Sequence, residues 1–389
     1  MSDRKPIPIT FVVTYISVFT HRAGTEGHLL RLLKRLDRDR FTPSLVALQQ
    51  TDWTDQYDDP DVPLHVMGFR SFQRPQDWMV ISKLAKFLKQ NKTQITELHF
   101  IDAHFVGALA SHLAKVPVVL SCRRDLGHQY GFKGKWLMKL GNRYVNRFIA
   151  NANVVADKMS QIESVDREKF EVIYNGVDLP VFDENLQQPV TPEFAKFVEG
   201  KRVVSIAANL RPVKNVALFI DAAARVAKQF DDVVFAIMGH GVLQEELEQQ
   251  AARCRIADRT LFLGSVPHVG PYVARSDVAC LSSHSEGFSN SVVEYMACST
   301  PVVVTEVGGL PEAIEQGKTG FAVPAGDAEA FANRIEEILR MDDSSRKAMG
   351  AAGRRRVEER FTMCGHLDAH ASLYEQQLEL AMSKSQNAS

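Results

Sequence analysis

Two glutamates, Glu286 and Glu294, lie eight residues apart in the segment SEGFSNSVVEYM, residues 285–296. A β-type run, VACLSS, precedes them, and a helical run, SVVEYMA, contains the second. The helix dipole favours an acid in the first turn of a helix, which accounts for Glu294 but not for Glu286. Small residues separate the two acids, and Ser289 or Asn290 can cap the helix. The segment therefore predicts a loop whose backbone can approach a ligand at a helix N-terminus.

Two cations stand in a similar place in ANLRPVKNVALF, residues 208–219. Arg211 and Lys214 precede a helical run, and Pro212 suits the first helical position. Cations oppose the dipole at a helix N-terminus, so they are an unusual structural choice there. They become favourable if a diphosphate binds at that point, where arginine offers a planar fork and lysine a point charge. The alternative is a pair of exposed surface cations.

Two glycine-containing turns complete the pattern. HRAGTEGHLL, residues 21–30, places Gly24 and Gly27 at the start of a helix, and TEVGGLPEAI, residues 305–314, places Gly308 and Gly309 before another. Backbone N–H groups at such a turn can bind an anion, although glycines often serve the turn alone. Four turns of this kind at one edge of two sheets predict a slot for a nucleotide diphosphate with a group attached.

The order of elements places these turns. Strand-like runs alternate with helical periods, which indicates parallel sheets with helices on both faces. The expected fold is two Rossmann-like, doubly wound units that face an interdomain cleft, with ligands beyond the carboxyl ends of the strands. We expect an N-terminal domain over residues 1–178, a linker with one short helix over 179–200, a C-terminal domain over 201–362 and a helical tail over 363–389 that can return to the first domain.

Composition narrows the function. The 389 residues carry a formal net charge of −1, which argues against a nucleic-acid coat. Residues 1–178 hold 25 Lys+Arg and 19 Asp+Glu, whereas the remainder holds 21 and 28, so the two halves suggest different partners. The five cysteines form no CxxC pair, which indicates a reducing compartment without structural zinc. The first apolar run, TFVVTYISV, is β-branched and predicts a strand rather than a signal peptide, and no run has the 18 apolar residues of a membrane span.

The motifs together resemble a known family. SEGFSNSVVEYMACSTPVVVTEVGGLPEAI is similar to the donor-site signature of the retaining glycosyltransferases of family 4, in which two glutamates are separated by seven residues. YNGVD (174–178), AGTEGHLL and LRPVKN resemble further segments of that family. The resemblance runs from about residue 10 to residue 360 and is most specific over 280–325. It implies the two-domain GT-B fold and catalysis without a metal or other cofactor.

The resemblance also implies roles for the donor-site residues. Glu294 would accept hydrogen bonds from ribose hydroxyls, and Glu286 would hold hydroxyls of the donor sugar. Lys214 and Arg211 would neutralise the leaving diphosphate. The family's arginine usually lies five residues before the lysine, where Asn209 stands here, so the role of Arg211 is less firmly placed. The expected donor-binding residues are Gly24, Asn209, Arg211, Lys214, Glu286, Gly287, Phe288, Ser289, Asn290 and Glu294.

A histidine of the first domain completes the expected catalytic set of Glu286, Lys214 and Arg211. ELHFIDAHFVGA offers His99 and His104, and His104 is preferred because the pattern places it beyond the strand and before the helix. Either histidine can instead be structural. Expected acceptor-binding residues are His99, Arg123, Arg124 and His128. Asp37-Arg38-Asp39 looks like a metal-binding Asp-x-Asp but ends a helical run, so no metal is expected.

A basic amphipathic helix is predicted over residues 134–148. Lys135, Lys139, Arg143 and Arg147 recur every four residues and would form one stripe, with Trp136 on the adjacent apolar face. Such a helix can lie on an anionic membrane, although an ordinary surface helix has the same pattern.

The sequence therefore predicts a cytoplasmic enzyme, at the inner face of the cell membrane, that transfers a sugar. The donor would be a nucleotide-diphosphate sugar, with UDP the commonest base in the family, and the acceptor a glycan or lipid-linked molecule of bacterial surface-polysaccharide assembly. The alternatives are a sugar phosphorylase, a sugar-nucleotide epimerase or an inactive nucleotide-sugar-binding subunit. A dehydrogenase is disfavoured because the first turn lacks GxGxxG.

Overall fold

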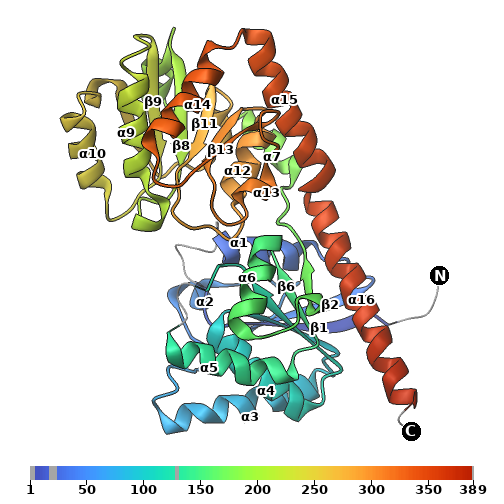
Figure 1. The fold of residues 1–389 in the computed structure, drawn as a ribbon. Helices are drawn as coiled ribbons and strands as arrows, with labels where there is room; N and C mark the ends of the chain where they lie inside the picture. The colour runs from blue at the N-terminus through green and yellow to red at the C-terminus, as the bar shows by residue number, and fades with distance from the viewer. Residues whose placement is uncertain (1–4, 17–23, 128–130, 388–389) are drawn as a thin grey trace. The chain divides into compact units, whose positions relative to one another are not determined.

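The computed structural model describes residues 5–16, 24–127 and 131–387. The chain forms two compact units (Figure 1). Unit 1 comprises the chain up to Ile173 together with the part from His366 onward, and unit 2 comprises Tyr174–Gly365. The C-terminal tail therefore belongs to unit 1. No helix within the described ranges is both long enough and apolar enough to cross a bilayer.

Unit 1 is built on a seven-stranded parallel sheet in the order β3-β2-β1-β4-β5-β6-β7. In β1, residues that point to both faces of the sheet, such as Phe11, Val12 and Val13, are fully buried because helices cover both faces. The strands are β1 (Ile7–Val13), β2 (Phe41–Ala47), β3 (Leu64–Val66), β4 (Ile95–His99), β5 (Val118–Arg123), β6 (Arg147–Ala150) and β7 (Phe170–Val172). The helices are α1 (Gly24–Arg35), α2 (Asp52–Gln56), α3 (Met79–Gln90), α4 (Ile101–Ala114), α5 (Phe132–Gly141), α6 (Asn153–Glu163) and α16 (Met363–Asn387).

Unit 2 is built on a six-stranded parallel sheet in the order β10-β9-β8-β11-β12-β13. Its strands are β8 (Arg202–Ala207), β9 (Val233–Met238), β10 (Thr260–Gly264), β11 (Val278–Leu281), β12 (Val302–Thr305) and β13 (Gly320–Val323). Its helices are α7 (Leu179–Leu186), α8 (Pro192–Val198), α9 (Val216–Val226), α10 (Gln244–Arg253), α11 (Gly270–Val273), α12 (Asn290–Ala297), α13 (Leu310–Ala313), α14 (Ala328–Arg340) and α15 (Asp343–Arg360). The prediction of two Rossmann-like parallel-sheet domains is confirmed.

Each sheet has one point where the strand order reverses, and ligands of doubly wound sheets bind at such points. In unit 1 the reversal lies between β1 and β4, which pair in parallel. In unit 2 it lies between β8 and β11, which also pair in parallel. The loops that leave these four strands diverge to opposite faces of their sheet, so functional side chains are expected on them.

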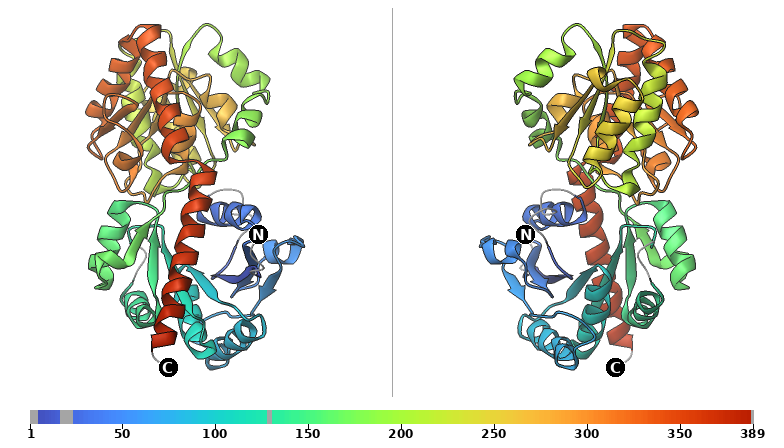
Figure 2. Two further views of the ribbon diagram at one scale, coloured as in Figure 1. Left: turned by 90° about the vertical axis from the view of Figure 1, so that its right-hand side faces the viewer. Right: turned by 90° about the vertical axis from the view of Figure 1, so that its left-hand side faces the viewer.

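Helix α16 crosses the sheet of unit 1 (Figure 2) and contributes to its core. Ala371, Leu373, Tyr374 and Leu378 are buried in the same cluster as Phe11 of β1. The helix is not a loose tail, because its apolar residues fill part of the interior of this unit.

Two segments differ from the expectation. The helix predicted over 134–148 ends at Gly141, and Arg143 lies in a short 3₁₀ turn while Arg147 begins β6. The four-residue spacing of cations therefore forms no single stripe, and only Lys135 and Lys139 lie on α5. Residues 179–200, expected to be a linker with one short helix, form the two helices α7 and α8. Asp183 of α7 holds Arg354 of α15 in a bidentate ion pair at 2.6 and 2.8 Å.

Candidate active site

An ion pair joins the two loops at the strand-order reversal of unit 2. The Lys214 Nζ lies 2.6 Å from the Glu286 Oε1, with the two side chains 23% and 11% exposed. Lys214 follows β8 and Glu286 follows β11, so residues 72 positions apart meet at one sheet edge. The Ser283 hydroxyl donates a second 2.6 Å hydrogen bond to the same carboxylate oxygen. The carboxylate is thus fixed in position while both charged groups still reach solvent.

Hydrogen bonds between the two loops hold this pair in place. The Ser282 hydroxyl donates to the carbonyl oxygen of Asn215 at 2.9 Å, and the His284 amide donates to the carbonyl oxygen of Val213 at 2.8 Å. Asn215 adopts a left-handed conformation with φ of 46°, which turns the chain sharply between Lys214 and α9. The lysine is therefore positioned by a tight turn and not by a regular helix.

The double glycine after β12 packs directly on the loop that contains Glu286. Gly308 has φ of +52°, and a Cβ atom there would collide with the carbonyl oxygen of Glu286. The Gly309 amide donates to the carbonyl oxygen of Gly287 at 2.8 Å. Gly308 is thus required both for its backbone conformation and for the close approach of the two loops.

We expect Gly308→Ala to destabilise unit 2 by about 1–3 kcal/mol, because the side chain is both strained and obstructed. Urea unfolding measures the loss. Gly326→Ala is the matched control, since Gly326 has φ of +84° but no atom within 4 Å of its added Cβ. Equal losses in the two variants would show that the contact with Glu286 contributes nothing.

Helix α12 begins at the other end of the same loop. Ser289 occupies the N-cap position but makes no side-chain capping bond, and the Asn290 Oδ1 accepts a hydrogen bond from the Asn175 amide at 2.8 Å. The Tyr295 hydroxyl bonds both the amide and the carbonyl of Ala207 at the end of β8. This anchor fixes the first turns of α12, including the partly exposed Glu294, against the strand that precedes Lys214.

The remaining donor-site candidates occupy different environments. Arg211 and Asn209 are exposed, and Phe288 is buried against Tyr174 and Phe361, so only its backbone can contribute to binding. Gly24 is the first residue of α1 in unit 1, with φ of +67°, and Gly27 lies inside that helix. The structure therefore brings Lys214, Glu286 and the start of α12 together within unit 2.

Sequence reasoning missed the Gly-His-Gly segment that follows β9. Gly239 has φ of +136°, and a Cβ on it would collide with the carbonyl oxygen of Ala208, as one on Gly241 would with that of Leu210. The Leu210 amide donates to the carbonyl oxygen of His240 at 3.1 Å. The segment thus supports the loop that presents Arg211, and two glycines directly after an apolar strand were the signal for it.

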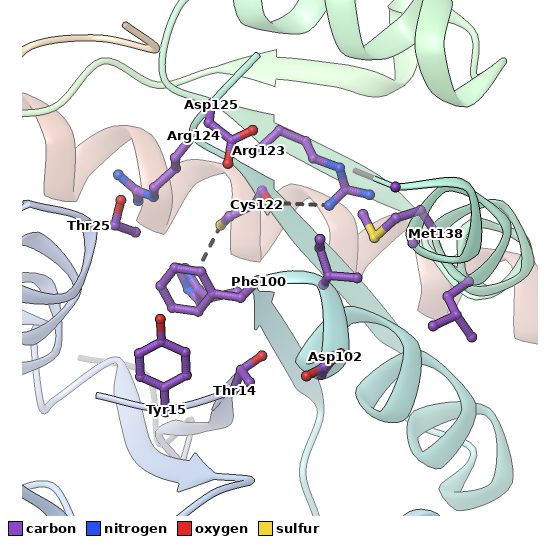
Figure 3. A pocket seen from close by; sticks show the side chains of 15 residues that line it. Thr14, Tyr15, Thr25, Phe100, Asp102, Cys122, Arg123, Arg124, Asp125 and Met138 are labelled. Carbon is purple, nitrogen blue, oxygen red and sulfur yellow. Dashed lines mark hydrogen bonds between the residues drawn. The ribbon is translucent and has the colours of Figure 1, made fainter. Parts of the chain in front are cut away.

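Unit 1 has a pocket of about 630 Å³ at its own strand-order reversal (Figure 3). It is lined from the end of β1, the β4–α4 junction, the end of β5 and α5. The lining residues are Thr14, Tyr15, Thr25, His99, Phe100, Ile101, Asp102, Cys122, Arg123, Arg124, Asp125, Gly131, Gly134, Leu137 and Met138. Figure 3 shows Tyr15 and Phe100 side by side in the pocket, and their rings are 6.2 Å apart.

The structure places His99 at the pocket, whereas the sequence favoured His104 for that position. His99 ends β4 and lines the pocket, whereas His104 lies within α4 and is fully buried. The His104 ring bonds the Ser121 hydroxyl at 2.8 Å and the carbonyl oxygen of Met138 at 3.1 Å. Helix α4 starts at Ile101, earlier than the pattern suggested, and this carries His104 into the interior. Burial and the nearby Arg123 hold the pKa of His104 well below its usual value.

The arginines expected to bind the acceptor differ in environment. Arg123 is 2% exposed and makes two charge-assisted bonds to Glu163, at 2.6 and 2.9 Å, and one to the Ser121 hydroxyl. It lines the pocket but also holds α6 to the sheet. Arg124 lines the pocket from a partly exposed position. His128 lies outside the described residues.

A buried polar network forms the floor of this pocket, and sequence analysis did not anticipate it. The Glu97 carboxylate accepts hydrogen bonds from the Tyr374 hydroxyl at 2.5 Å and from the Cys122 thiol at 3.3 Å, and contacts the His99 Nε2 at 2.9 Å. Burial alone would raise the pKa of Glu97, but His370 and His99 hold it well below its usual value. Tyr374 lies 277 positions from Glu97, so no local pattern could reveal the contact.

Within the described residues, Glu97, His99 and Cys122 also form a group with metal-ligand chemistry. Their ligand atoms lie within 4.8 Å of one another. Burial raises the pKa of the Cys122 thiol well above its usual value, aided by Glu97, which favours the neutral thiol over the thiolate that a metal needs. The His99 Nε2 and the Cys122 thiol both contact the Glu97 carboxylate, whereas the His99 Nδ1 is buried without a hydrogen-bond partner among the described residues.

Family models of known proteins match both halves of the chain. The family model described as Glycosyltransferase Family 4 matches residues 22–180, and that described as Glycosyl transferases group 1 matches residues 188–356. The chain belongs to glycosyltransferase family 4. The family assignment drawn from the motifs is therefore confirmed.

Relatives of this family 4 chain include two of known activity. N-acetyl-alpha-D-glucosaminyl L-malate synthase of Bacillus anthracis is 26% identical over 316 residues, 78% of this chain and 81% of the relative. The UDP-Gal:alpha-D-GlcNAc-diphosphoundecaprenol alpha-1,3-galactosyltransferase of Escherichia coli is 24% identical over 379 residues, 93% of this chain and 96% of the relative.

Solved structures share the fold. HepE of Anabaena, crystallised with UDP, has a TM-score of 0.79 at 22% identity and covers 97% of this chain and all of its own. A glycosyltransferase of Rickettsia africae has a TM-score of 0.81 at 19% identity, over 96% of this chain and 99% of its own. These likenesses confirm the GT-B fold.

Proposed function

We propose that the protein is a retaining, metal-independent glycosyltransferase that moves a sugar from a UDP-sugar to a lipid-linked glycan acceptor in bacterial surface-polysaccharide assembly. The Lys214–Glu286 pair at the strand-order reversal of unit 2 carries the proposal. The Escherichia coli relative, named for a UDP-galactose donor and a diphosphoundecaprenol acceptor, supports both substrate classes. The peripheral-membrane and cytoplasmic setting follows from such an acceptor.

Unit 2 would bind the donor. The backbone of residues 287–290 and the start of α12 would receive the diphosphate, and Glu294 would accept hydrogen bonds from the ribose hydroxyls. Lys214 would move from Glu286 toward the diphosphate as charge develops on the leaving group, and Arg211 would add a second cation. Glu286 would then be released to hold the hydroxyls of the sugar. Preorganised charges of this kind usually supply the largest part of catalysis.

Unit 1 would bind the acceptor. The pocket between β1, β4 and β5 combines the cation Arg124 with His99 and Asp102. Burial raises the pKa of Asp102, which suits a carboxylate that accepts a proton from a hydroxyl. Sequence analysis did not single out Asp102, because its pattern placed no chemistry between the two histidines.

The first experiment is a donor panel. Purified protein in EDTA is mixed with UDP-, GDP- and ADP-sugars, and the melting temperature is recorded. A ligand at 100 times its Kd adds about 2.7 kcal/mol to the free energy of unfolding. We expect a UDP-sugar to stabilise the protein and Glu294→Ala to abolish that gain, whereas Glu246→Ala, an exposed acid on α10, leaves it intact.

Stabilisation by none of the nucleotide sugars at millimolar concentration would contradict the proposal. Release of a sugar phosphate that depends on inorganic phosphate would instead indicate a phosphorylase. Loss of the ligand effect in EDTA, restored by a divalent cation, would contradict metal independence.

A further inference from the structure

A second hollow of about 630 Å³ lies beside the pocket of unit 1 and shares Asp102 and Leu137 with it. We call it the aromatic groove. Its lining residues are Phe69, Arg70, Ser71, Phe72, Gln73, Trp78, Asp102, Trp136 and Leu137. The loop before α3 forms one wall and α5 forms the other. Since the two hollows have common lining residues, one extended ligand can occupy both.

The wall before α3 is a preformed aromatic cluster. The Phe72 ring lies 4.9 Å from Phe69, 5.6 Å from Trp78 and 5.4 Å from Phe105. Phe69 and Phe105 are buried and fix the cluster, whereas Trp78 is 44% exposed. On the opposite wall Trp136 is 59% exposed. Large apolar side chains gathered around a groove mark a binding surface more often than a chance exposure.

Two polar groups of the loop, the Trp78 ring nitrogen and the Asp77 carboxylate, already have partners. The Trp78 Nε1 donates to the carbonyl oxygen of Phe72 at 3.1 Å, and the Asp77 carboxylate accepts the backbone amides of Arg70 and Ser71 at 2.8 and 3.0 Å. A sugar stacked on tryptophan also needs hydrogen-bond partners for its hydroxyls, and these groups are already engaged. Five of the nine lining residues are aromatic or aliphatic, so the groove offers a hydrocarbon chain a largely apolar surface.

Arginine side chains line both hollows. Arg70 lines the groove itself. Arg124 lines the adjoining pocket. This combination of an apolar channel and nearby cations complements an amphiphile with a phosphate at its head.

We propose that the aromatic groove binds the hydrocarbon chain of a lipid-linked acceptor, while the phosphate and sugar of that acceptor enter the adjoining pocket. The inference rests on the proposed function for the identity of the acceptor. Trp78 and Trp136 are then specificity-determining residues, which distinguish a lipid-linked acceptor from the same head group without its chain.

The tryptophans make the test direct. The chain has three tryptophans, and the third, Trp53, is 8% exposed and lies against Tyr57. In a Trp53→Phe background, fluorescence reports only Trp78 and Trp136. The probe is farnesyl phosphate below its critical micelle concentration, with inorganic phosphate and maltotriose in parallel. We expect saturable fluorescence change with farnesyl phosphate alone.

Single variants locate the binding. Trp136→Ala, followed through Trp78, and Trp78→Ala, followed through Trp136, should each weaken farnesyl phosphate binding about tenfold. Leu113→Ala is the matched control, because Leu113 is 53% exposed in the same unit but outside the groove, and it should bind as the parent does.

Each other outcome overturns the inference. An equal response to inorganic phosphate would place binding in the pocket alone, and saturation by maltotriose but not farnesyl phosphate would make the groove a glycan platform. Unchanged affinity in both tryptophan variants would place the chain elsewhere. UDP-sugar stabilisation, measured on the same variants, separates the two proposals: its failure removes the proposed function, whereas its persistence without farnesyl phosphate binding removes the groove alone.

Discussion

Lys214→Ala should lower the rate of sugar release from the donor about 10²- to 10³-fold, with a much smaller effect on folding. The lysine is the cation held closest to the Glu286 carboxylate, at 2.6 Å. Removal of one preorganised group that stabilises charge in a transition state costs on the order of 10²–10³ in kcat. The fold should survive because Ser283 still bonds the carboxylate and the loops remain joined by backbone contacts.

The measurement is nucleotide release from the sugar donor that stabilises the wild-type protein, with the melting temperature as a check on folding. Lys228→Ala, an exposed lysine of unit 2, is the matched control. Lys214→Arg should recover part of the rate, since arginine keeps the positive charge but spreads it over a planar guanidinium group. A Lys214→Ala enzyme with unchanged kcat would show that the pair is only a structural ion pair.

Unit 1 should lose stability steeply as the pH falls below about 6.5, the usual pKa of histidine. Burial is the main cause that lowers the pKa of His28, His99 and His104, so the folded state keeps all three neutral. The unfolded state binds protons at these sites below pH 6.5, and stability therefore falls as the pH falls. Each site contributes about 1.4 kcal/mol per pH unit, so three approach about 4 kcal/mol per unit.

Tryptophan fluorescence during urea unfolding reports this unit alone, because all three tryptophans lie in it. His104→Gln should reduce the pH slope by about one third. His112→Gln, on the same helix but exposed, is the control. A slope that stays unchanged in His104→Gln would contradict neutral burial of this histidine.

The sequence predicted the position of the loops that contain Lys214 and Glu286, because parallel strands bring their carboxyl ends to one edge of a sheet. Lys214 and Glu286 were each placed after a strand, and their meeting follows from β8 pairing with β11. The predicted position of His104 was wrong because a sequence pattern places a helix start only to within a few residues. Asp102 lines the pocket, whereas His104, two residues later, lies in the interior. The prediction of one helix over residues 134–148 was wrong because α5 ends at Gly141, while the four-residue spacing of cations continues by chance into β6.

Other parts of the site depend on contacts between distant segments. Arg123 was expected to meet a ligand phosphate, but Glu163, 40 positions away, holds its guanidinium. The Glu97 network needs Tyr374 and His370 from α16. Such partners become visible only when the packing of the last helix is known.

The return of α16 to unit 1 has a consequence for synthesis on the ribosome. Unit 1 is discontinuous, since residues 174–365 must be made between its two parts. A nascent chain that has released only the first 173 residues lacks the Tyr374 hydroxyl that bonds Glu97 and the apolar residues that complete the core. The unit that is made first is therefore completed last, and until α16 is synthesised part of its apolar core lacks its cover and is prone to aggregate.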